Sequence, residues 1–404
     1  MTIERRPTRA LIYSHDTFGL GHLRRCRAIA HALVERNPEM SVMILSGSPI
    51  IGNFDFRQRV DYVRVPVVIK LRNGDYVSQS LDIDIDQTVA MRSSIIQHTA
   101  EIFDPDIFIV DKEPLGLRGE VEDTLEMLSA RGTPLVLGLR DVMDEPSLLG
   151  PEWERKNVVP ALASLYDEIW VYGLPQVCDP LADINIPSHV RRKMVFTGYL
   201  EREPVRRKQT AEHDVPFDQP YLLVTPGGGG DGEALVDWVL RAYEYDKKAP
   251  YPALLVFGPF MQKDKQAEFA RRAADLPMVE AITFDANIEH LIERAMGIVA
   301  MGGYNTFCEI LTFDKPAIVV PRTEPRLEQF IRAERAQELG LLRMLPDDDV
   351  RRASDMATAL RQLPQQQRPS DVVVPGLLDG LDNVNRLATR LIANRGRRMV
   401  AVAE

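Results

Sequence analysis

A glycine-rich turn follows the first apolar run of the sequence, in the stretch DTFGLGHLRR at residues 16–25. The spacing Gly19-x-Gly21 allows the backbone to approach a phosphate group at the start of a following helix. Arg24 stands where the dinucleotide-binding fingerprint requires its third glycine, the one that lets helix and strand pack closely. The stretch therefore does not predict a dehydrogenase.

A second turn, in VTPGGGGDGEALVDWVL, has consecutive glycines between a predicted strand and a predicted helix. Unhindered backbone amides at Gly227, Gly228 and Gly229 are suited to a phosphate at the helix N-terminus. The alternative is a flexible connection. Consecutive glycines lose much conformational entropy on ordering, however, which disfavours an unused loop.

A third turn lies in AMGGYNTFCEILTF, where a predicted strand ends at Gly302 and Gly303. A helix is expected to begin directly after these glycines, and Glu309 lies about one turn further along. Backbone amides at a helix start suit a diphosphate, and a carboxylate can accept two hydrogen bonds from a vicinal diol such as ribose. From the residues alone, a solvated helical glutamate explains Glu309 at least as well.

Two acidic motifs carry further candidates. LDIDIDQ contains Asp82, Asp84 and Asp86, a spacing that could bind a divalent cation. The alternation of aspartate with leucine and isoleucine predicts instead a strand with one wet face. FDPDIFIVDKEP places Asp111 and Glu113 at the carboxyl end of a predicted strand, where ligand-binding residues project, so Asp111 is a reserve catalytic candidate.

Composition sets the class of protein. The chain has 404 residues, of which 45% are hydrophobic and 27% charged, and a formal net charge of −10. A single hydrophobic core rarely grows beyond ~250–300 residues, so two domains are expected. The acidic balance argues against nucleic-acid binding, and no apolar run reaches the ~20 residues that cross a bilayer. Three distant cysteines and a short amino-terminal apolar stretch predict a cytoplasmic protein without disulfides, zinc ligands or a signal peptide.

Short β-rich runs alternate with helical segments in both halves of the chain, which predicts an α/β fold with parallel sheets. The expected strands are residues 10–14, 41–46, 106–110, 135–139, 169–172, 194–197, 221–225, 253–257, 280–283, 297–300 and 317–320. Ligands bind beyond the carboxyl ends of such strands, so the two domains are expected to face an interdomain cleft.

The domain boundaries follow from a polar, proline-punctuated stretch after residue 198. We predict a first domain over residues 1–200, a linker over 201–219 and a second domain over 220–385. The last segment, 386–404, reads as a basic amphipathic helix that packs back onto the first domain.

Three motifs of the second half resemble the donor-binding domain of the family 28 glycosyltransferases. They are GGYNT..E, then KPAIVVPR, then EQ..RA.....LG, all within residues 300–340. The opening stretch is similar to the amino-terminal GxGH loop of the same family. The resemblance is thin between residues 50 and 200.

The resemblance implies a GT-B fold with two Rossmann-like domains, in which the first holds the acceptor and the second holds a nucleoside-diphosphate sugar. Carried over by position, Glu309 would bind the ribose hydroxyls and Glu328 with Gln329 the donor sugar. Phe284 and Ile288 would frame the base. The diphosphate would lie at the glycine turns and the helix start, at Gly19, Gly21, Gly227, Gly228, Gly229, Gly302, Gly303, Asn305 and Thr306. Glu328 departs from the peptidoglycan enzymes, where a second glutamine is expected, and this leaves the donor sugar open.

Inversion at an anomeric carbon requires a group that takes the proton of the acceptor hydroxyl. His22, with an ordinary pKa near ~6.5, is the favoured base, and Asp16 is the alternative. His22 could instead cap a helix or donate to a phosphate. Arg24 and Arg25 could neutralise the departing diphosphate, although arginines in a first helical turn are usually solvated. His15 is expected only to shape the turn, and His31 to be a packed or surface residue.

The resulting prediction is an inverting, metal-independent glycosyltransferase that uses a nucleoside-diphosphate sugar, with uridine as the expected nucleoside, and a hydroxyl acceptor such as a lipid-linked or polysaccharide precursor. No cofactor beyond this co-substrate is expected. The alternatives are a nucleotide-sugar hydrolase or epimerase, and a non-catalytic sugar-nucleotide-binding protein.

Residues 53–74 mix aromatic, apolar and basic residues. This composition is typical either of a peripheral contact with the inner face of a membrane or of a buried strand with flanking loops.

Overall fold

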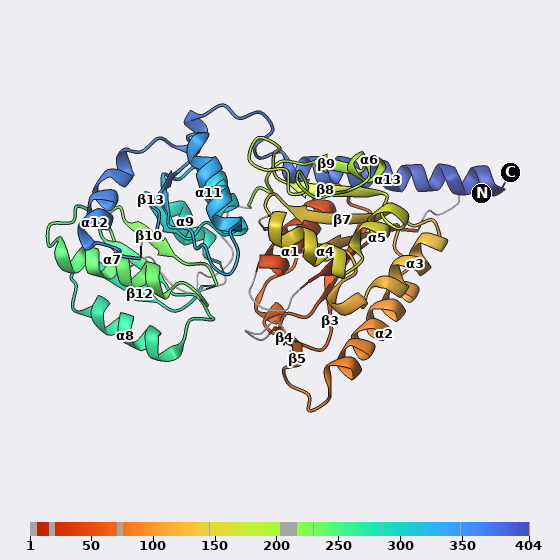
Figure 1. Cartoon of the computed structure of the whole chain (residues 1–404), viewed down its shortest axis with the longest axis horizontal. Coiled ribbons are helices and arrows are strands. Elements are labelled where there is room, and N and C mark those ends of the chain that lie inside the picture. Colours follow the sequence, from red (N-terminus) through yellow and green to blue (C-terminus); the bar gives the residue numbers. More distant parts are fainter. Residues whose placement is uncertain are drawn as a thin grey trace. The chain divides into compact units, whose positions relative to one another are not determined.

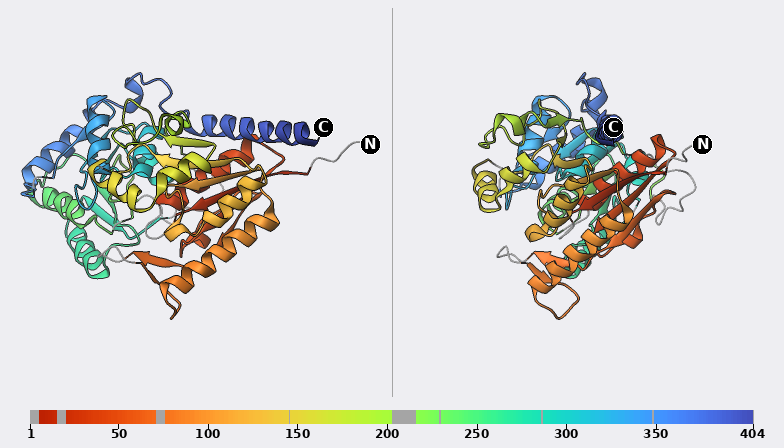
Figure 2. Two further views of the ribbon diagram at one scale, coloured as in Figure 1. Left: turned by 45° about the vertical axis from the view of Figure 1, so that its right-hand side comes forward. Right: turned by 90° about the vertical axis from the view of Figure 1, so that its right-hand side faces the viewer.

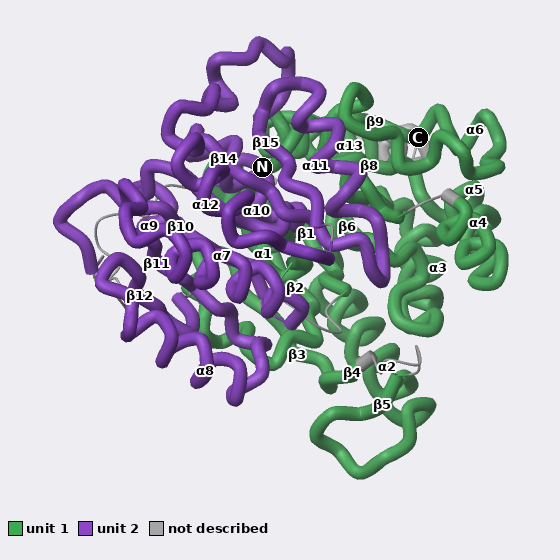
Figure 3. Tube along the Cα trace, turned by 60° about the vertical axis from the view of Figure 1, so that its left-hand side comes forward, with its two compact units in different colours: residues 1–200, 379–404 green, residues 201–378 purple. Residues whose placement is uncertain are grey.

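The computed structural model describes residues 6–15, 21–70, 76–144, 146–202, 216–228, 230–285, 287–347 and 349–403 (Figure 1). The chain forms two compact units (Figure 3). Unit 1 comprises residues 1–200 together with 379–404, and unit 2 comprises residues 201–378. Most of the predicted linker lies outside the described residues.

Unit 1 is built on a parallel sheet of seven strands, in the order β3-β2-β1-β6-β7-β8-β9. Its central strands are nearly continuous apolar runs because helices cover both faces of such a sheet. The strands are β1 Thr8–Ser14, β2 Met40–Ser46, β3 Val60–Arg64, β6 Ile107–Asp111, β7 Leu135–Arg140, β8 Glu168–Tyr172 and β9 Met194–Phe196. A separate antiparallel pair consists of β4 Val68–Lys70 and β5 Tyr76–Ser78.

The helices of unit 1 connect these strands, and the last of them comes from the end of the chain. They are α1 Gly21–Arg36, α2 Ile85–Phe103, α3 Glu122–Ala130, α4 Pro146–Arg155, α5 Val158–Ser164, α6 Ser188–Arg191 and α13 Gly380–Ala403. Helix α1 ends just before Asn37 and Pro38, as the sequence predicts. No helix among the described residues has an apolar stretch long enough to cross a membrane.

Unit 2 repeats this plan with a parallel sheet of six strands, in the order β12-β11-β10-β13-β14-β15. The strands are β10 Leu222–Thr225, β11 Ala253–Val256, β12 Val279–Ile282, β13 Gly297–Ala300, β14 Ala317–Val319 and β15 Arg343–Met344. The helices are α7 Glu233–Tyr245, α8 Lys263–Ala274, α9 Glu289–Arg294, α10 Tyr304–Thr312, α11 Glu328–Glu338 and α12 Ala353–Gln362. The predicted α/β fold with two parallel sheets is confirmed.

In both sheets the first strand of the unit lies in the middle and the chain then runs outward in opposite directions. The reversal falls between β1 and β6 in unit 1 and between β10 and β13 in unit 2. At such a topological switch point the loops that leave the two neighbouring strands diverge, and ligands bind there, beyond the carboxyl ends of the strands. Ligand-binding residues are therefore expected at these two places.

The carboxyl-terminal helix α13 belongs to unit 1 (Figures 1 and 2, blue). It begins at Gly380, earlier than the predicted residue 386, and packs against α1. The Asn37 side chain donates to Asn385 Oδ1 at 3.3 Å. Leu200 and Asp379 form an antiparallel bridge, so the chain leaves unit 1 and returns to it at the same place.

The acidic motif at residues 82–86 is not the predicted strand. Asp84 caps the N-terminus of α2, because its Oδ1 accepts the backbone N–H of Gln87 at 2.7 Å. Asp86 forms an ion pair of 2.9 Å with Arg118. The alternation of aspartate with apolar residues was therefore misleading, since a strongly favoured helix cap overrides it. Among the described residues, no group of three or more histidine, cysteine or acidic side chains is arranged to hold a metal ion.

Candidate active site

His22 and Asp111 meet at the switch point of unit 1. His22 is the second residue of α1, which follows β1, and Asp111 is the last residue of β6. Because β1 and β6 are neighbours in the sheet, the start of α1 lies over the carboxyl end of β6. His22 Nδ1 lies 2.5 Å from Asp111 Oδ2. Two predicted catalytic residues, 89 positions apart in the sequence, are thus in direct contact.

Arg25 holds the other side of the Asp111 carboxylate. Its Nε donates to Oδ1 at 2.8 Å and its Nη2 to Oδ2 at 2.7 Å, a bidentate pair. Arg25 is 1% exposed, so the expectation of a solvated arginine was wrong. The signal in the sequence was its position three residues after His22, which places both side chains on one face of α1.

The charges in this cluster determine which nitrogen of His22 carries a proton. Burial would raise the pKa of the Asp111 carboxyl, but Arg25 and His22 hold it well below its usual range. Burial also lowers the pKa of His22 to about 4, against the opposing effect of Asp111. At neutral pH an ionised Asp111 therefore accepts from Nδ1–H, and Nε2 of a neutral His22 has the lone pair of a base.

Two lysines and a glutamate follow at the same edge of the sheet. Lys112 has a left-handed backbone (φ 68°), which is uncommon for a lysine and recurs at functional sites. Its neighbour Glu113 pairs with Lys156 at 2.9 Å. Burial would raise the pKa of Glu113, but Lys112, His15 and Lys156 hold it well below its usual range. The edge beside His22 therefore carries several charged groups.

The glycine turn at the end of β13 has the geometry that was predicted for it. Gly302 has φ 77°, and a Cβ there would lie 2.6 Å from Val319 Cγ1, so only glycine fits. Gly303 is the N-cap of α10, and a Cβ there would meet nothing within 4 Å. The space beside the Gly303 Cα is thus open at the N-terminus of α10, where the helix dipole favours an anion.

The turn after β10 lies beside the start of α10. Gly227 has φ 81°, and a Cβ there would come 3.9 Å from Thr306 Oγ1. Gly258, after β11, packs tightly on the same turn, because its Cβ would lie 2.5 Å from Gly227 O. Phe260 N donates to Gly228 O at 3.0 Å. Gly227 and Gly228, the described residues at the start of this turn, are therefore packed against the segment that follows β11.

Glu309 lies in α10 and is 1% exposed, so a solvated role is excluded. Asn305 lies one turn earlier, and its Oδ1 accepts a hydrogen bond of 2.5 Å from Nη2 of Arg202. Phe284 and Ile288 are half-buried in the segment that follows β12. Whether Glu309 binds ribose and the other residues bind the diphosphate and the base remains a prediction.

An arginine that sequence reasoning missed connects the predicted sugar-binding residues. Arg322 donates through Nη2 to Glu328 Oε1 at 2.7 Å, and its backbone N–H donates to Gln329 Oε1 at 3.2 Å. Its Nη1 donates to Asp231, which follows the glycine turn. Arg322 therefore orients both predicted sugar-binding side chains and connects them to the residue that follows the glycine turn.

Some candidate residues lie outside the described residues, namely Asp16, Gly19 and Gly229. Gly21, the first residue of α1, is described.

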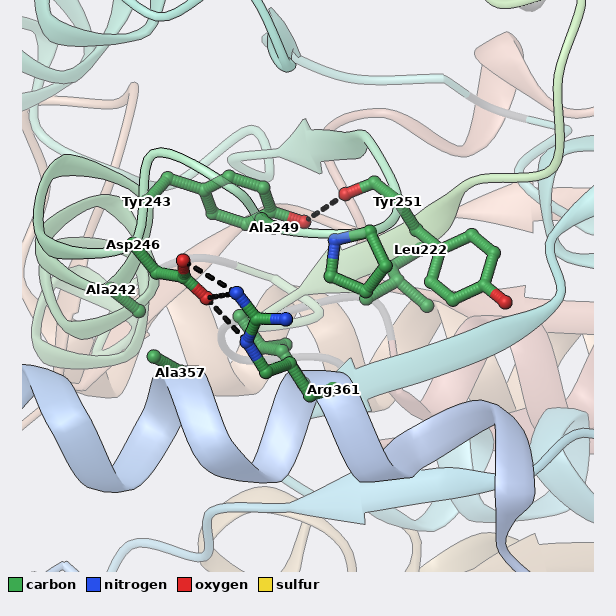
Figure 4. A pocket seen from close by; sticks show the side chains of 10 residues that line it. Leu222, Ala242, Tyr243, Asp246, Ala249, Tyr251, Ala357 and Arg361 are labelled. Carbon is green, nitrogen blue, oxygen red and sulfur yellow. Dashed lines mark hydrogen bonds and ion pairs between the residues drawn. The ribbon is translucent and has the colours of Figure 1, made fainter.

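A small cavity of about 10 Å³ in unit 2 is lined by Leu222, Tyr243 and Ala357 and lies beside the Asp246–Arg361 ion pair (Figure 4). Leu222 is the first residue of β10, so this cavity lies at the edge opposite the glycine turns.

The sequence and fold of the chain are similar to those of known glycosyltransferases. Residues 222–369 match the glycosyltransferase family 28 C-terminal domain. An uncharacterized glycosyltransferase of Methanosarcina mazei is 24% identical over 81% of this chain and 83% of its own length. The UDP-N-acetylglucosamine--N-acetylmuramyl-(pentapeptide) pyrophosphoryl-undecaprenol N-acetylglucosamine transferase of Rubrobacter xylanophilus is 26% identical over 42% of this chain and 44% of its own length.

Solved structures resemble almost the whole chain. UGT71G1 of Medicago truncatula, solved with UDP-glucose, has a TM-score of 0.63 at 12% identity and covers 97% of this chain and 100% of its own. MurG of Acinetobacter baumannii has a TM-score of 0.52 at 14% identity, with the same coverage. At these identities the likeness shows the fold, which is GT-B.

Proposed function

Because the chain is a family 28-like glycosyltransferase with a GT-B fold, we propose that it transfers a sugar from a UDP-sugar to a hydroxyl acceptor with inversion and without a metal ion. Unit 2 binds the donor and unit 1 provides the base. The observation that carries this proposal is the contact of 2.5 Å between His22 and Asp111 at the switch point of unit 1.

In the proposed reaction His22 Nε2 takes the proton of the acceptor hydroxyl as its oxygen attacks the anomeric carbon. The bond from that carbon to the diphosphate breaks on the opposite side, so the configuration inverts. Asp111 orients the imidazole and stabilises the imidazolium that forms, while Arg25 keeps the Asp111 carboxylate ionised.

The departing UDP is stabilised by the protein rather than by a cation. The start of α10, with Gly302, Gly303, Asn305 and Thr306, takes the diphosphate together with Gly227 and Gly228. Glu309 binds the ribose, Phe284 and Ile288 the uracil, and Glu328 with Gln329 the sugar. Asp84 and Asp86 are engaged in a helix cap and an ion pair, which supports independence from metal.

The proposal is tested with the full chain and two donors, UDP-N-acetylglucosamine and UDP-glucose. A thermal-shift screen of nucleoside diphosphates first identifies the base that binds, because a specific ligand raises the melting temperature. UDP release is then measured with and without acceptors, which include soluble phenols and a polyprenyl-diphosphate glycolipid. We expect release that requires an acceptor, an inverted product by NMR, and no effect of EDTA.

The controls separate the alternatives. Rapid UDP release without any acceptor would show a hydrolase, and UDP binding without turnover would show a binding protein. His22→Ala and Asp111→Asn are expected to lower kcat about 100-fold or more, without weakening UDP binding. His98→Ala, whose side chain is 72% exposed on α2, is the matched control and is expected to leave kcat unchanged.

A lipid-linked acceptor would bring the protein to the inner face of a membrane, in polysaccharide or cell-envelope synthesis. Residues 76–81, beside the aromatic and basic segment 53–70, carry the exposed side chains of Val77 and Leu81, which supports a peripheral contact. Flotation with liposomes that contain anionic lipid tests this. Absence of the protein from the lipid fraction at low salt would refute it.

A further inference from the structure

A second imidazole lies beside the proposed base. His15 directly follows β1 and is 5% exposed. The centroid of its ring is 5.8 Å from that of His22, and the two ring planes are nearly perpendicular, at 83°. The proposed mechanism assigns no role to this buried and titratable group.

A buried chain of polar side chains reaches His15 from α2. Arg92 donates to Glu120 through Nε at 2.5 Å and through Nη2 at 2.6 Å. Tyr13 Oη donates to Glu120 Oε1 at 2.5 Å and lies 3.3 Å from His15 Nδ1. Arg92, Glu120 and Tyr13 are each 1% exposed. The chain is therefore shielded from water over its whole length.

The chemistry of these groups fixes the direction of each hydrogen bond. The carboxylate of Glu120, paired with a guanidinium, can only accept, so it takes the one hydroxyl proton of Tyr13. The oxygen of Tyr13 is then an acceptor for His15. It follows that Nδ1 of His15 carries a hydrogen and that Nε2 of the neutral ring does not.

The surroundings also disfavour a charge on His15. Burial is the largest effect and lowers the pKa of His15 well below its ordinary value. The positive charges of Lys112 and Arg92, and His22 when it is protonated, act in the same direction, while Glu113 opposes them.

We propose that His15 is a positioning residue for His22, held as the neutral Nδ1–H tautomer by the Arg92–Glu120–Tyr13 chain. The inference rests on the proposed function. The ring of His15 supports the ring of His22 in the orientation that Asp111 requires. Because His15 is neutral, it does not repel the positive charge that His22 acquires during proton transfer. A cation at His15 would oppose that charge.

The tautomer is tested without any assay of activity. Nitrogen-15 NMR distinguishes the two neutral tautomers and the cation of an imidazole, and a His15→Asn variant assigns the signals. We expect the Nδ1–H form of His15 in the wild-type chain at pH 7, and a loss of this preference in Tyr13→Phe. An Nε2–H form or an imidazolium in the wild-type chain would overturn the proposal, whatever the protein catalyses.

Kinetics test the positioning. Tyr13→Phe is expected to lower kcat about tenfold with an unchanged KM for the donor, and to cause no further loss in a His22→Ala background. The matched control is Tyr243→Phe, which removes another buried hydroxyl, one that donates to Tyr251 O at 2.8 Å (Figure 4), and is expected to leave kcat unchanged.

An equal loss of rate in both backgrounds, or an equal loss in Tyr243→Phe, would show a merely structural effect and overturn the proposal. If no donor is turned over, the proposed function fails while the tautomer measurement still decides the state of His15. That measurement on the wild-type chain also stands if Tyr13→Phe does not fold.

Discussion

Arg25 and Asp111 form a buried, two-point ion pair between the first helix and the fourth strand of the sheet in unit 1, β6. The hydrogen bonds measure 2.8 and 2.7 Å, and each side chain is 2% exposed. A single carboxylate thus bonds to an arginine and to the proposed base His22. The pair is part of the core and of the candidate active site, so a substitution here is expected to affect both stability and rate.

Replacing Arg25 by methionine is expected to destabilise unit 1. The Asp111 carboxylate would remain buried without its guanidinium, and the loss of one partner from such a pair costs about 3–5 kcal/mol. Urea unfolding followed by circular dichroism measures the change. Arg27→Met is the control, because Arg27 on the same helix donates to a backbone oxygen at the surface. Equal stability of the two variants would contradict the role of the pair.

Stability is expected to fall as the pH is lowered from about 6.5 toward 4. Burial lowers the pKa of His22 to about 4 in the folded chain. Between these values the unfolded chain binds a proton that the folded chain does not, so the free energy of unfolding rises with pH in this window. Urea unfolding at several pH values checks the slope.

The matched variant for this pH dependence is His22→Asn, which cannot titrate in that window. Its slope between pH 4 and 6.5 is expected to be smaller than that of the wild-type chain. Identical slopes in the two chains would mean that His22 keeps its ordinary pKa.

Glu309→Ala is expected to weaken UDP binding by about 1–3 kcal/mol, the cost of leaving buried polar partners unsatisfied. Isothermal titration calorimetry with UDP measures it. Glu334→Ala, an exposed glutamate on α11, is the control. Wild-type affinity in the Glu309 variant would show that the carboxylate does not contact the ribose.

Alanine at the two neighbouring glycines of the β13 turn should have different effects, a loss of stability at Gly302 and a loss of UDP binding at Gly303. Gly302→Ala is expected to cost about 1–3 kcal/mol of stability, because φ is 77° and the new Cβ would meet Val319 at 2.6 Å. Gly303→Ala has an ordinary φ of −56° and open space, so the melting temperature should not change. UDP binding should weaken instead, since the methyl group enters the proposed diphosphate site. Unchanged affinity in Gly303→Ala would move the diphosphate elsewhere.

Most of the strands could be predicted from the sequence, because strands buried on both faces are nearly continuous apolar runs. Strand β3 was expected only as one of two alternatives for residues 53–74, since its burial pattern is mixed and its sequence is VDYVR. The start of α2 was missed because Asp84 and Asp86 alternate with apolar residues. This two-residue period predicted a strand, whereas Asp84 is the N-cap of the helix. Such errors fall where two local signals compete for the same few residues.

The sequence alone determined that the chain has two α/β halves, that glycine turns containing Gly227 and Gly302 follow two of the strands, and that a helical pattern follows His22. Those features depend on neighbours within a few positions. Only the tertiary structure decided that Arg25 is buried, that Asp111 is its partner and that Arg322 joins the residues at the start of α11. The reason is physical: the strand order places β6 beside β1, and this brings together side chains 86 positions apart that no local pattern connects.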